Sequence, residues 1–365
     1  MKSVYKNTFP VCFLSESSIL IFKKGVFHVL NLVSGEISLV VKFKTSFKES
    51  ILTRIPLLSR ILRRGIRCGI KVSDKLVLFV VRQKIYELDL EKRQISDGFA
   101  TADGSRPLTF SKIDGINEFK DGIYFGGYKG NSNKNPISIY RRIQTDQWEE
   151  VYQFPSNTIE HIHNIIADPY KNIVYIFTGD FNQAAGIWIA EKGFKSVLPV
   201  LVGEQKFRAC VGFPTPKGLV YATDSPFENN SIRLLKNNGK EWETNQIMDI
   251  NGPSIYGCQW GNNLLFSTSV EDDGRNRDII DMLVKNKRGA GIKENYSYIY
   301  MGNLENGFKE IYKVKKDWLP FYLFQLGVLI FPAGLNESSY LLVFHIATKR
   351  NSMNTILVNS VKNSM

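Results

Sequence analysis

The sequence predicts an all-β protein folded as a β-propeller, with seven blades as the favoured count and six as the alternative. Three observations lead to this fold. A strand–turn–strand unit recurs along the chain, its copies lie about 45 to 64 residues apart, and 24 Phe and 16 Tyr favour strands. A spacing near 45 residues is what a blade of four short strands and their turns requires.

Each copy of the unit has a strand, a short turn rich in Gly, Asn, Asp or Lys, and a second apolar strand. The seven copies cover residues 11–22, 70–81, 116–128, 161–180, 210–224, 256–271 and 322–334. Their second strands begin near Ile19, Leu76, Ile123, Val174, Leu219, Leu264 and Val328. Runs such as VFHVLNL, EISLVVKF and KIYELDL supply outer strands. We therefore expect residues 1–365 to form one propeller domain.

A basic amphipathic segment separates the first two blades. Over residues 51–71, leucines and isoleucines occupy one half of a helical wheel and arginines the other, which predicts a short helical insertion at residues 50–68. The arginines are Arg60, Arg63, Arg64 and Arg67. Such a helix can lie on an anionic membrane surface, or it can cap the propeller with its arginines in solvent. The sequence leaves both interpretations open.

Two later segments depart from the repeat. Residues 272–296 are polar, charged and glycine-containing, which predicts a long loop insertion over one face. Residues 318–336 form the only long uncharged stretch, but Pro320 and Pro332 interrupt it and its apolar part is too short to span a bilayer. We expect two buried strands there.

Composition restricts the partners. A formal charge of +12 favours an anionic partner, either acidic glycan or a membrane surface, unless it only reflects a Lys- and Asn-rich composition. No familiar RNA- or DNA-binding motif is present, so no nucleic acid is expected. Four widely spaced cysteines without a CxxC pair predict buried thiols. The N-terminal segment lacks the pattern of a secretory signal, which predicts a cytoplasmic location, or a peripheral one at the inner membrane.

Polar side chains occur at the strand ends that would surround the propeller axis. The start of a blade's first strand and the end of its second lie on the same face, because the two strands are antiparallel. These positions hold His161, His163, Arg208, Tyr256, Lys316, Asp317, Tyr128, Asp180, Asp224 and Glu271. The sequence therefore predicts a polar axial pocket.

The two histidines and three carboxylates are the predicted catalytic residues. His161 and His163 share one face of a strand, and with Asp180 they could ligate a divalent metal, the one candidate cofactor. They could instead be proton shuttles or a hydrogen-bonded strand start. Asp180, Asp224 and Glu271 suit acid/base cleavage of a glycosidic bond, and the two aspartates could also be turn caps.

The remaining polar positions suit substrate binding. Arg208, at a strand start, needs an anion from the protein or from a ligand, and Arg106 lies close enough to the third unit to join it. Acidic and amide side chains bind sugar hydroxyls, and tyrosines stack on sugar faces. The predicted substrate-binding residues are Arg106, Tyr128, Gln205, Arg208, Asn229, Tyr256, Lys316, Asp317 and Gln325.

Several of these runs resemble one protein family. HIHNIIADPYKNIVYIFTGD, GEQKFRACV, VYATDSPFENNSI and KKDWLPFYLFQLG look like the sialidase-like β-propeller proteins of bacterial exopolysaccharide, capsule and lipopolysaccharide gene clusters. The resemblance covers roughly residues 50–345 and is specific at the HxH, GD, QxxR, TDSP and KD positions. It implies a propeller of glycan metabolism, often described as glycosyl hydrolase-like.

The sequence thus predicts a carbohydrate-active protein that cleaves or modifies an acidic, lipid-linked or free glycan, as a hydrolase or a lyase. Its alternative is a non-catalytic propeller that binds glycan or serves as a scaffold at the membrane through the basic helix. The absence of a Ser-His-Asp elbow, a phosphate-binding loop and a CxxC metal pattern excludes esterase, kinase and zinc-finger classes.

Overall fold

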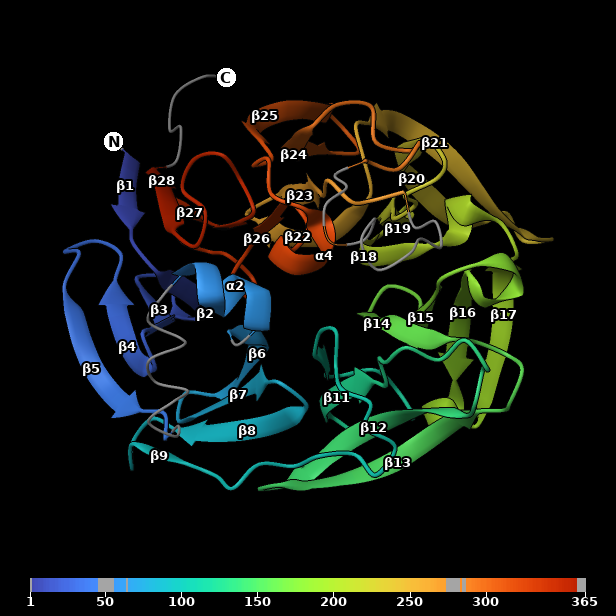
Figure 1. The fold of residues 1–365 in the computed structure, drawn as a ribbon. Helices are drawn as coiled ribbons and strands as arrows, with labels where there is room; N and C mark the ends of the chain where they lie inside the picture. Colours follow the sequence, from blue (N-terminus) through green and yellow to red (C-terminus); the bar gives the residue numbers. More distant parts are fainter. Residues whose placement is uncertain (1, 45–55, 64, 274–282, 284–286, 360–365) are drawn as a thin grey trace.

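The chain folds as a seven-bladed β-propeller, which confirms the predicted fold class over the six-bladed alternative (Figure 1). The computed structural model describes residues 2–44, 56–63, 65–273, 283 and 287–359. These residues form seven four-stranded sheets around one axis, and all their strand pairs within sheets are antiparallel.

Blades 1 to 4 follow one another in simple chain order. Blade 1 comprises β2 (Thr8–Ser15), β3 (Ser18–Lys23), β4 (Val26–Asn31) and β5 (Ile37–Lys42). Blade 2 comprises β6 (Ile66–Ser73), β7 (Leu76–Val81), β8 (Lys84–Asp89) and β9 (Gln94–Ile95). Blade 3 comprises β10 (Ser111–Ile113), β11 (Gly122–Gly126), β12 (Ile137–Gln144) and β13 (Gln147–Phe154). Blade 4 comprises β14 (His161–Asp168), β15 (Ile173–Gly179), β16 (Gly186–Glu191) and β17 (Ser196–Val202).

Blade 7 closes the ring with strands from both ends of the chain. Blade 5 comprises β18 (Ala209–Thr215), β19 (Gly218–Thr223), β20 (Asn230–Asn237) and β21 (Trp242–Ile250). Blade 6 comprises β22 (Ser254–Trp260), β23 (Asn263–Thr268), β24 (Tyr296–Asn303) and β25 (Gly307–Lys315). Blade 7 comprises β26 (Val328–Ile330), β27 (Tyr340–Ile346), β28 (Thr355–Asn359) and β1 (Lys2–Tyr5).

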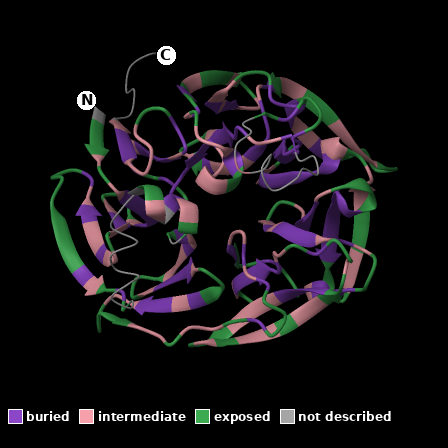
Figure 2. Cartoon of the chain, in the orientation of Figure 1, coloured by how far each residue is buried: buried purple, intermediate pink, exposed green. Residues whose placement is uncertain are grey.

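The core lies between neighbouring blades rather than at one centre. β15 is buried along its whole length, and Figure 2 shows that buried residues concentrate in the inner strands while outer strands are largely exposed. Between blades 3 and 4, Ile139, Ile162 and Val174 belong to one apolar cluster. Burial of these faces, worth about 25 cal/mol per Å² of apolar surface, stabilises the ring.

Short helices occur in the connections. α2 (Pro56–Leu62) joins blades 1 and 2, and α4 (Phe321–Phe324) joins blades 6 and 7. Single 3-10 turns are η1 (Asn182–Ala184), η2 (Lys192–Phe194) and η3 (Gln205–Phe207). The fourth strand of a blade ends on the face where the next inner strand begins, so α2 and α4 lie on that face (Figure 1). Among the described helices, none is long and apolar enough to cross a membrane.

Two of the predicted strand pairs are wrong. In blade 3 the inner strand is β10, a three-residue strand at 111–113, and residues 116–120 belong to the turn region instead. In blade 7 the predicted first strand at 322–326 contains helix α4, and Val328 begins the inner strand rather than the second. Residues 318–336 therefore supply one strand and not two, because Pro320 starts a helical turn there.

The basic helix also differs from its predicted form. α2 is shorter than the 50–68 insertion, residues 50–55 and Arg64 lie outside the described residues, and Arg67 belongs to strand β6. Its two faces are reversed as well: Leu57 and Leu62 are 46% and 40% exposed, whereas Arg60 is 5% exposed. Tertiary ion pairing overrides the helical-wheel pattern here.

The predicted loop at residues 272–296 is described only in part. Residues 274–282 and 284–286 lie outside the described residues. Asp272 forms a β-bridge with Arg288, the amide of Gly291 donates to the carbonyl of Pro226, and strand β24 begins at Tyr296. The end of the predicted insertion is therefore folded against blade 5 and joins blade 6.

Candidate functional site

Strand register brings His161, His163 and Asp180 together. In blade 4, His161 at the start of β14 pairs with Gly179 at the end of β15, so Asp180 is the next residue after the partner of His161. A register shift between Ile162 and Asn164 leaves His163 as the extra residue of a β-bulge. Bulges re-aim side chains, and this one turns the second imidazole toward the first.

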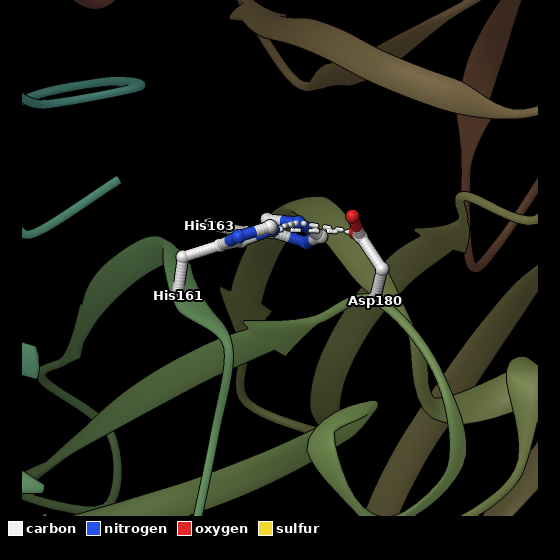
Figure 3. A group of neighbouring side chains, drawn as sticks. All are labelled: His161, His163 and Asp180. Carbon is white, nitrogen blue, oxygen red and sulfur yellow. Dashed lines mark hydrogen bonds and ion pairs between the residues drawn. The ribbon is translucent and has the colours of Figure 1, made fainter. Parts of the chain in front are cut away.

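Gly179 makes room for this arrangement. A Cβ at position 179 would overlap the imidazole of His163, so this strand end accepts no side chain. His161 is 4% exposed and His163 is 3% exposed, and both rings point at the carboxylate of Asp180 (Figure 3). The backbone of blade 4 therefore preorganises a compact group of three potential ligands.

The three potential ligand atoms form a small triangle. His161 Nε2 lies 3.1 Å from His163 Nε2, and Asp180 Oδ1 lies 3.3 Å from the first nitrogen and 3.2 Å from the second. Ligands bound at about 2.1 Å to one metal ion are separated by about 3.0 to 3.4 Å in octahedral or tetrahedral geometry. The spacing therefore fits three ligands on one side of a divalent cation.

The hydrogen bonds of the imidazoles strengthen this interpretation. His161 Nδ1 lies 3.1 Å from the carbonyl oxygen of Lys129, and His163 Nδ1 lies 2.9 Å from that of Ala209. A carbonyl oxygen only accepts, so each Nδ1 carries a hydrogen and each neutral ring presents its Nε2 lone pair inward. Two lone pairs and a carboxylate oxygen then face one another. A cation or a shared proton is needed between them.

Burial disfavours the proton as that cation. Burial lowers the pKa of His163, and the charges of His161 and Arg208 act in the same direction, against the opposing effect of Asp180. A protonated imidazole at this position is therefore costly. The residues fit a metal ion better than a shared proton.

Arg208 joins the aspartates of two blades. Its Nη2 lies 3.1 Å from Asp180 Oδ1, and its Nε lies 3.4 Å from Asp224 Oδ2. The Sγ of Cys210 donates to the same Asp224 oxygen at 3.2 Å. The amide of Asp224 donates to the carbonyl of Arg208 at 3.0 Å, which fixes the ends of β18 and β19 beside blade 4.

Several polar atoms in this group are buried without a hydrogen bond. They are Asp180 Oδ1, Arg208 Nε and Nη1, and Asp224 Oδ1. Of these, Asp180 Oδ1 and Arg208 Nε take part in the ion pairs given above. Buried polar groups in folded proteins are nearly always satisfied, because an unmade hydrogen bond costs about 1–3 kcal/mol. Unsatisfied donors and acceptors on both signs of charge are what a binding site for a polar ligand leaves free.

The two aspartates titrate in opposite directions. Burial alone would raise the pKa of Asp180, but the two imidazoles and Arg208 outweigh it and hold that pKa well below its usual range. Burial raises the pKa of Asp224 to about 8, with Glu271 and Asp180 adding to the effect against Arg208. Asp180 is thus a permanent anion near neutral pH, whereas Asp224 can hold a proton.

Glu271 stands beside this pair. Burial, and the negative charge of Asp180, raise the pKa of Glu271, while a 2.5 Å hydrogen bond from Ser269 and the charge of Arg208 oppose the rise. Burial of Arg208 would lower its pKa, but Asp224, Asp180 and Glu271 raise it above its ordinary value. The site therefore combines one fixed cation, one fixed anion and two carboxyl groups that favour protonation.

Tyr128, Tyr256 and Gln205 complete the predicted ring. The Tyr128 ring lies 4.4 Å from that of His161, between centroids. Tyr256 lines an axial cavity of about 330 Å³ together with His163. Gln205 holds the backbone of Asp180 in place, because its Nε2 donates to the carbonyl of Asp180 at 2.9 Å.

Four predicted site residues lie elsewhere. Lys316, Asp317 and Gln325 form a separate group with Arg60: the Arg60–Asp317 ion pair measures 2.7 Å, and Gln325 Nε2 donates to the carbonyl of Arg60 at 2.6 Å. Lys316 Nζ donates to the carbonyl of Leu319 at 2.6 Å, so it holds the loop before α4. Asn229 is exposed in the loop before β20. Asp317 and Gln325 are not brought to the histidines, because Arg60 binds both of them at α2.

Sequence reasoning missed residues that the inner strands also bring to the axis. Cys210 lies at a β-bulge in blade 5 that matches the His163 bulge in blade 4, and both residues line the axial cavity. His163, Cys210 and Asp224 form a second group whose potential ligand atoms lie within 4.8 Å of one another. The sequence contains a signal for Cys210: it lies two residues after Arg208, just as His163 lies two residues after His161.

Two aromatic side chains stand at the rim. Phe181 follows Asp180 directly, and its ring lies 5.5 Å from that of Phe227; both side chains are 38% exposed. The guanidinium of Arg208 lies 5.3 Å from the Phe181 ring centroid. Exposed rings beside charged groups are suited to the apolar face of a sugar.

Comparisons with known proteins agree on the fold. No family model matches the sequence, and no well-characterised protein matches it by sequence. An oligogalacturonate lyase from Vibrio parahaemolyticus superposes with a TM-score of 0.58 at 12% identity, covering 98% of this chain and 91% of its own. An oligogalacturonate lyase in complex with manganese gives 0.52 at 12% identity, covering 99% and 91%.

A third solved structure shares the same architecture. The β-propeller domain of Cps50 (Swd1) from Myceliophteria thermophila gives a TM-score of 0.57 at 6% identity, covering 99% of this chain and 100% of its own. At such identities the likeness establishes the fold alone. The chain is a seven-bladed β-propeller similar in fold to oligogalacturonate lyases and to other propellers.

Proposed function

We propose that this protein is a metal-dependent lyase that cleaves an acidic oligosaccharide at the axial site. The observation that carries the proposal is the triangle of His161 Nε2, His163 Nε2 and Asp180 Oδ1, with edges of 3.1 to 3.3 Å, beside unsatisfied atoms of Arg208 and Asp224. The fold likeness to two oligogalacturonate lyases, one in complex with manganese, supports the same chemistry.

The metal would be held by the two histidines and Asp180. A bound divalent cation supplies a Lewis acid that stabilises the negative charge developing on a sugar carboxylate when its α-proton leaves. Arg208 and the backbone contact from Gln205 keep Asp180 in position. Asp180 is then a ligand and a fixed charge, and it is not free to be an acid or a base.

Proton transfer falls to Asp224 and Glu271. Burial and mutual repulsion keep these two carboxyl groups from ionising together, so one can accept a proton while the other delivers one. In the elimination, the base takes the proton α to the sugar carboxylate, a carbon–carbon double bond forms, and the glycosidic carbon–oxygen bond breaks. The acid protonates the departing oxygen, and no water is consumed.

A hydrolase is the neighbouring alternative and differs in its product. Hydrolysis would add water and leave a saturated sugar, and it needs two free carboxyl groups flanking the bond. The commitment of Asp180 to both imidazoles and Arg208 favours elimination. Sialidase-like hydrolysis is the less favoured outcome of the same test.

The test is turnover of an acidic oligosaccharide with defined metal content. The protein, stripped with chelator and reloaded with Mn²⁺, is incubated with oligogalacturonate, and the ultraviolet absorbance of the unsaturated product is followed. We expect activity with Mn²⁺, its loss after chelation, and loss of stoichiometric metal in His161→Ala and His163→Ala. Arg93→Gln, in the exposed turn between β8 and β9, is the control and should behave as the parent.

Three results would contradict the proposal. If the protein binds metal but forms no unsaturated product from uronate oligosaccharides, the lyase assignment is wrong. Saturated products with a new reducing end would replace it by hydrolysis. Equal metal binding by the His161→Ala variant and the parent would remove the metal site.

The proposed biological setting is bacterial surface polysaccharide metabolism in the cytoplasm. The support is the resemblance of the HxH, GD, QxxR and TDSP runs to propellers of exopolysaccharide and capsule gene clusters. Mapping the genes adjacent to this one tests the setting. Glycosyltransferase and polymerase genes beside it are the expected result, and an unrelated neighbourhood would contradict it.

A membrane-bound scaffold, which would also suit a lipid-linked glycan, is the second candidate function. The observation that favours it is that Leu57, Leu62 and Arg63 of the α2 segment are exposed together. Arg60 cannot contribute, because it is buried against Asp317. Flotation with anionic vesicles tests it: Leu57→Glu/Leu62→Glu should release the protein, and no parent in the lipid fraction would exclude this function.

A further inference from the structure

A second group of cations lies around Tyr128, a neighbour of His161. Arg67 at the start of β6 places its guanidinium carbon 5.0 Å from the ring centroid of Tyr128, and the centroid of that ring lies 4.4 Å from the centroid of the His161 ring. Tyr128 therefore contacts both Arg67 and one of the candidate metal ligands. Arg67 brings a positive charge from blade 2 to this ring.

Arg106 belongs to the same group through the backbone. The amide of Arg106 donates to the carbonyl of Tyr128 at 3.2 Å, and the amide of Tyr128 donates to the carbonyl of Arg106 at 2.9 Å. The side chain donates through Nη1 to the carbonyl of Arg82 at 3.1 Å. Burial, and then the nearby positive charges of Arg67 and Arg63, lower the pKa of Arg106, so these cations repel one another.

No described carboxylate neutralises this pair. Among the described residues, neither Arg67 nor Arg106 lies within ion-pair distance of an acidic side chain, and Arg67 Nε is buried without a hydrogen bond. Arg208 differs, because Asp180 and Asp224 both contact it. Partly buried arginines that have no counter-charge among the described residues favour binding of an anion.

The location of Arg67 shows where that anion would enter. Arg67 and Tyr256 line both the axial cavity of about 330 Å³ and a neighbouring cavity of about 370 Å³. His163 lines the first of these cavities. An anionic group beside Arg67 is therefore on the same continuous surface as a group held at His163.

We propose that Arg67 and Arg106, which both contact Tyr128 beside His161, bind a second carboxylate of the acidic oligosaccharide. This inference rests on the proposed function and narrows its substrate to a glycan with two acidic groups on neighbouring sugars. One acidic group binds at the histidine–Asp180 site, and the next binds the arginine pair. Arg208, which already contacts Asp180 and Asp224, is a positioning residue for Asp180 rather than the main anion-binding group.

The experiment compares a substrate that has two free carboxylates with a substrate that has one. Steady-state kinetics are measured for the Mn²⁺-loaded parent, Arg67→Gln, Arg106→Gln, Arg67→Lys and the surface control Arg93→Gln. The substrates are digalacturonate and its derivative methyl-esterified on one carboxylate. Binding of inorganic sulfate, by calorimetry on the same proteins, tests the anion site without any turnover.

We expect a selective loss of affinity. KM for digalacturonate should rise about 10- to 100-fold in Arg67→Gln and Arg106→Gln with a smaller change in kcat, as expected for a lost charged hydrogen bond. For the mono-ester, parent and variants should converge, and Arg67→Lys should recover part of the affinity. Sulfate should bind the parent and Arg93→Gln and fail to bind both glutamine variants.

The outcomes separate this inference from the proposed function. Turnover with the same KM in parent and glutamine variants would overturn the anion site and leave the lyase standing. No turnover of any uronate, with sulfate still bound through Arg67, would overturn the lyase and keep the anion site. Sulfate binding that is equal in parent and Arg67→Gln overturns the anion site whatever the kinetics.

Discussion

Two buried arginine–aspartate groups lie on the same face of the propeller, and they differ in how well they are satisfied. Arg60 of α2 donates to Asp317 at 2.7 Å and to the carbonyl of Phe324, and Asp317 also accepts from the amide of Leu319 at 3.2 Å. Arg60 leaves only Nε without a hydrogen bond, whereas Arg208, between Asp180 and Asp224, leaves both Nε and Nη1 without one. The first group is structural, and the second is arranged for a ligand.

The difference shows that burial of a charge does not identify a site by itself. Both arginines are at least nine-tenths buried, at 5% and 7% exposure. They differ in the number of buried polar atoms without a hydrogen bond: the Arg60 group has one, and the Arg208–Asp180–Asp224 group has four. A group with more unsatisfied atoms retains more capacity to bind a ligand. Substitutions in the two groups should therefore have opposite signatures.

Asp317→Asn should give the largest loss of stability. Removing one partner of a buried pair leaves Arg60 with an uncompensated charge, and we expect the free energy of unfolding to fall by about 3–5 kcal/mol. Denaturant titration measures this loss. The exposed ion pair of Lys75 and Glu91 is the control, since Glu91→Gln should cost less than about 1 kcal/mol. A small effect of Asp317→Asn would remove the structural assignment.

Asp180→Asn should instead reduce activity more than stability. A neutral amide cannot supply the charge that holds the metal, and we expect kcat/KM to fall about 10²- to 10³-fold. Arg208 keeps Asp224 as a partner, so the unfolding free energy should fall less than in Asp317→Asn. Metal analysis and denaturant titration on the same sample check both points. If Asp180→Asn loses as much unfolding free energy as Asp317→Asn, the two groups do not differ in the way described.

Gly179→Ala tests whether the histidine geometry matters. The added Cβ overlaps the His163 imidazole, so the ring must move, and we expect a 10- to 100-fold loss of metal affinity. Gly65→Ala, where a Cβ would meet no atom within 4 Å, is the matched control. Competition with a chromogenic chelator gives the affinities. Unchanged affinity in Gly179→Ala would argue against metal binding through His163.

The last expected difference between the two aspartates of the site is in the pH dependence of stability. Asp224 has a raised pKa of about 8, so its contribution is present below its unfolded value near 3.8 and is lost as pH rises through about 8. Asp180 has a depressed pKa, so its contribution is present above about 3.8 and is lost as pH falls below that value.

Unfolding free energies at a series of pH values test these opposite signs. Between pH 5 and 8 the parent should lose stability as pH rises, and Asp224→Asn should flatten that slope. Asp180→Asn should leave the slope in place and change stability only in more acidic solution. A parent curve that rises between pH 5 and 8 and is unaffected by Asp224→Asn would exclude a protonated Asp224.

The inner strands and part of the site follow from sequence alone. Alternation and turn chemistry identify β14 and β15, and the antiparallel register then places His161 beside Asp180. The same reasoning reaches Arg208 and Asp224 in the next blade. These contacts are predictable because each pair of strand ends is close in sequence and repeats from blade to blade.

Other features depend on long-range partners that no local pattern contains. The helical wheel places Arg60 in solvent, yet its partner Asp317 lies 257 residues away and buries it. Arg67 continues the same basic run but starts a strand that faces Tyr128. The inner strand β10 has only three residues, too few for alternation to distinguish it from the adjoining turn.

Closure of the ring places a limit on folding. β1 pairs residue by residue with β28, so Lys2 meets Val358 and Tyr5 meets Thr355. A nascent chain can complete blades 1 to 6 in order as it emerges, but the last sheet waits for segments separated by almost the whole polypeptide. Such distant pairing is slow because its loop-closure entropy is paid late. If synthesis stops before residue 355, β28 is missing and blade 7 cannot close the ring. The incomplete ring should then expose apolar surface that chaperones or proteases recognise.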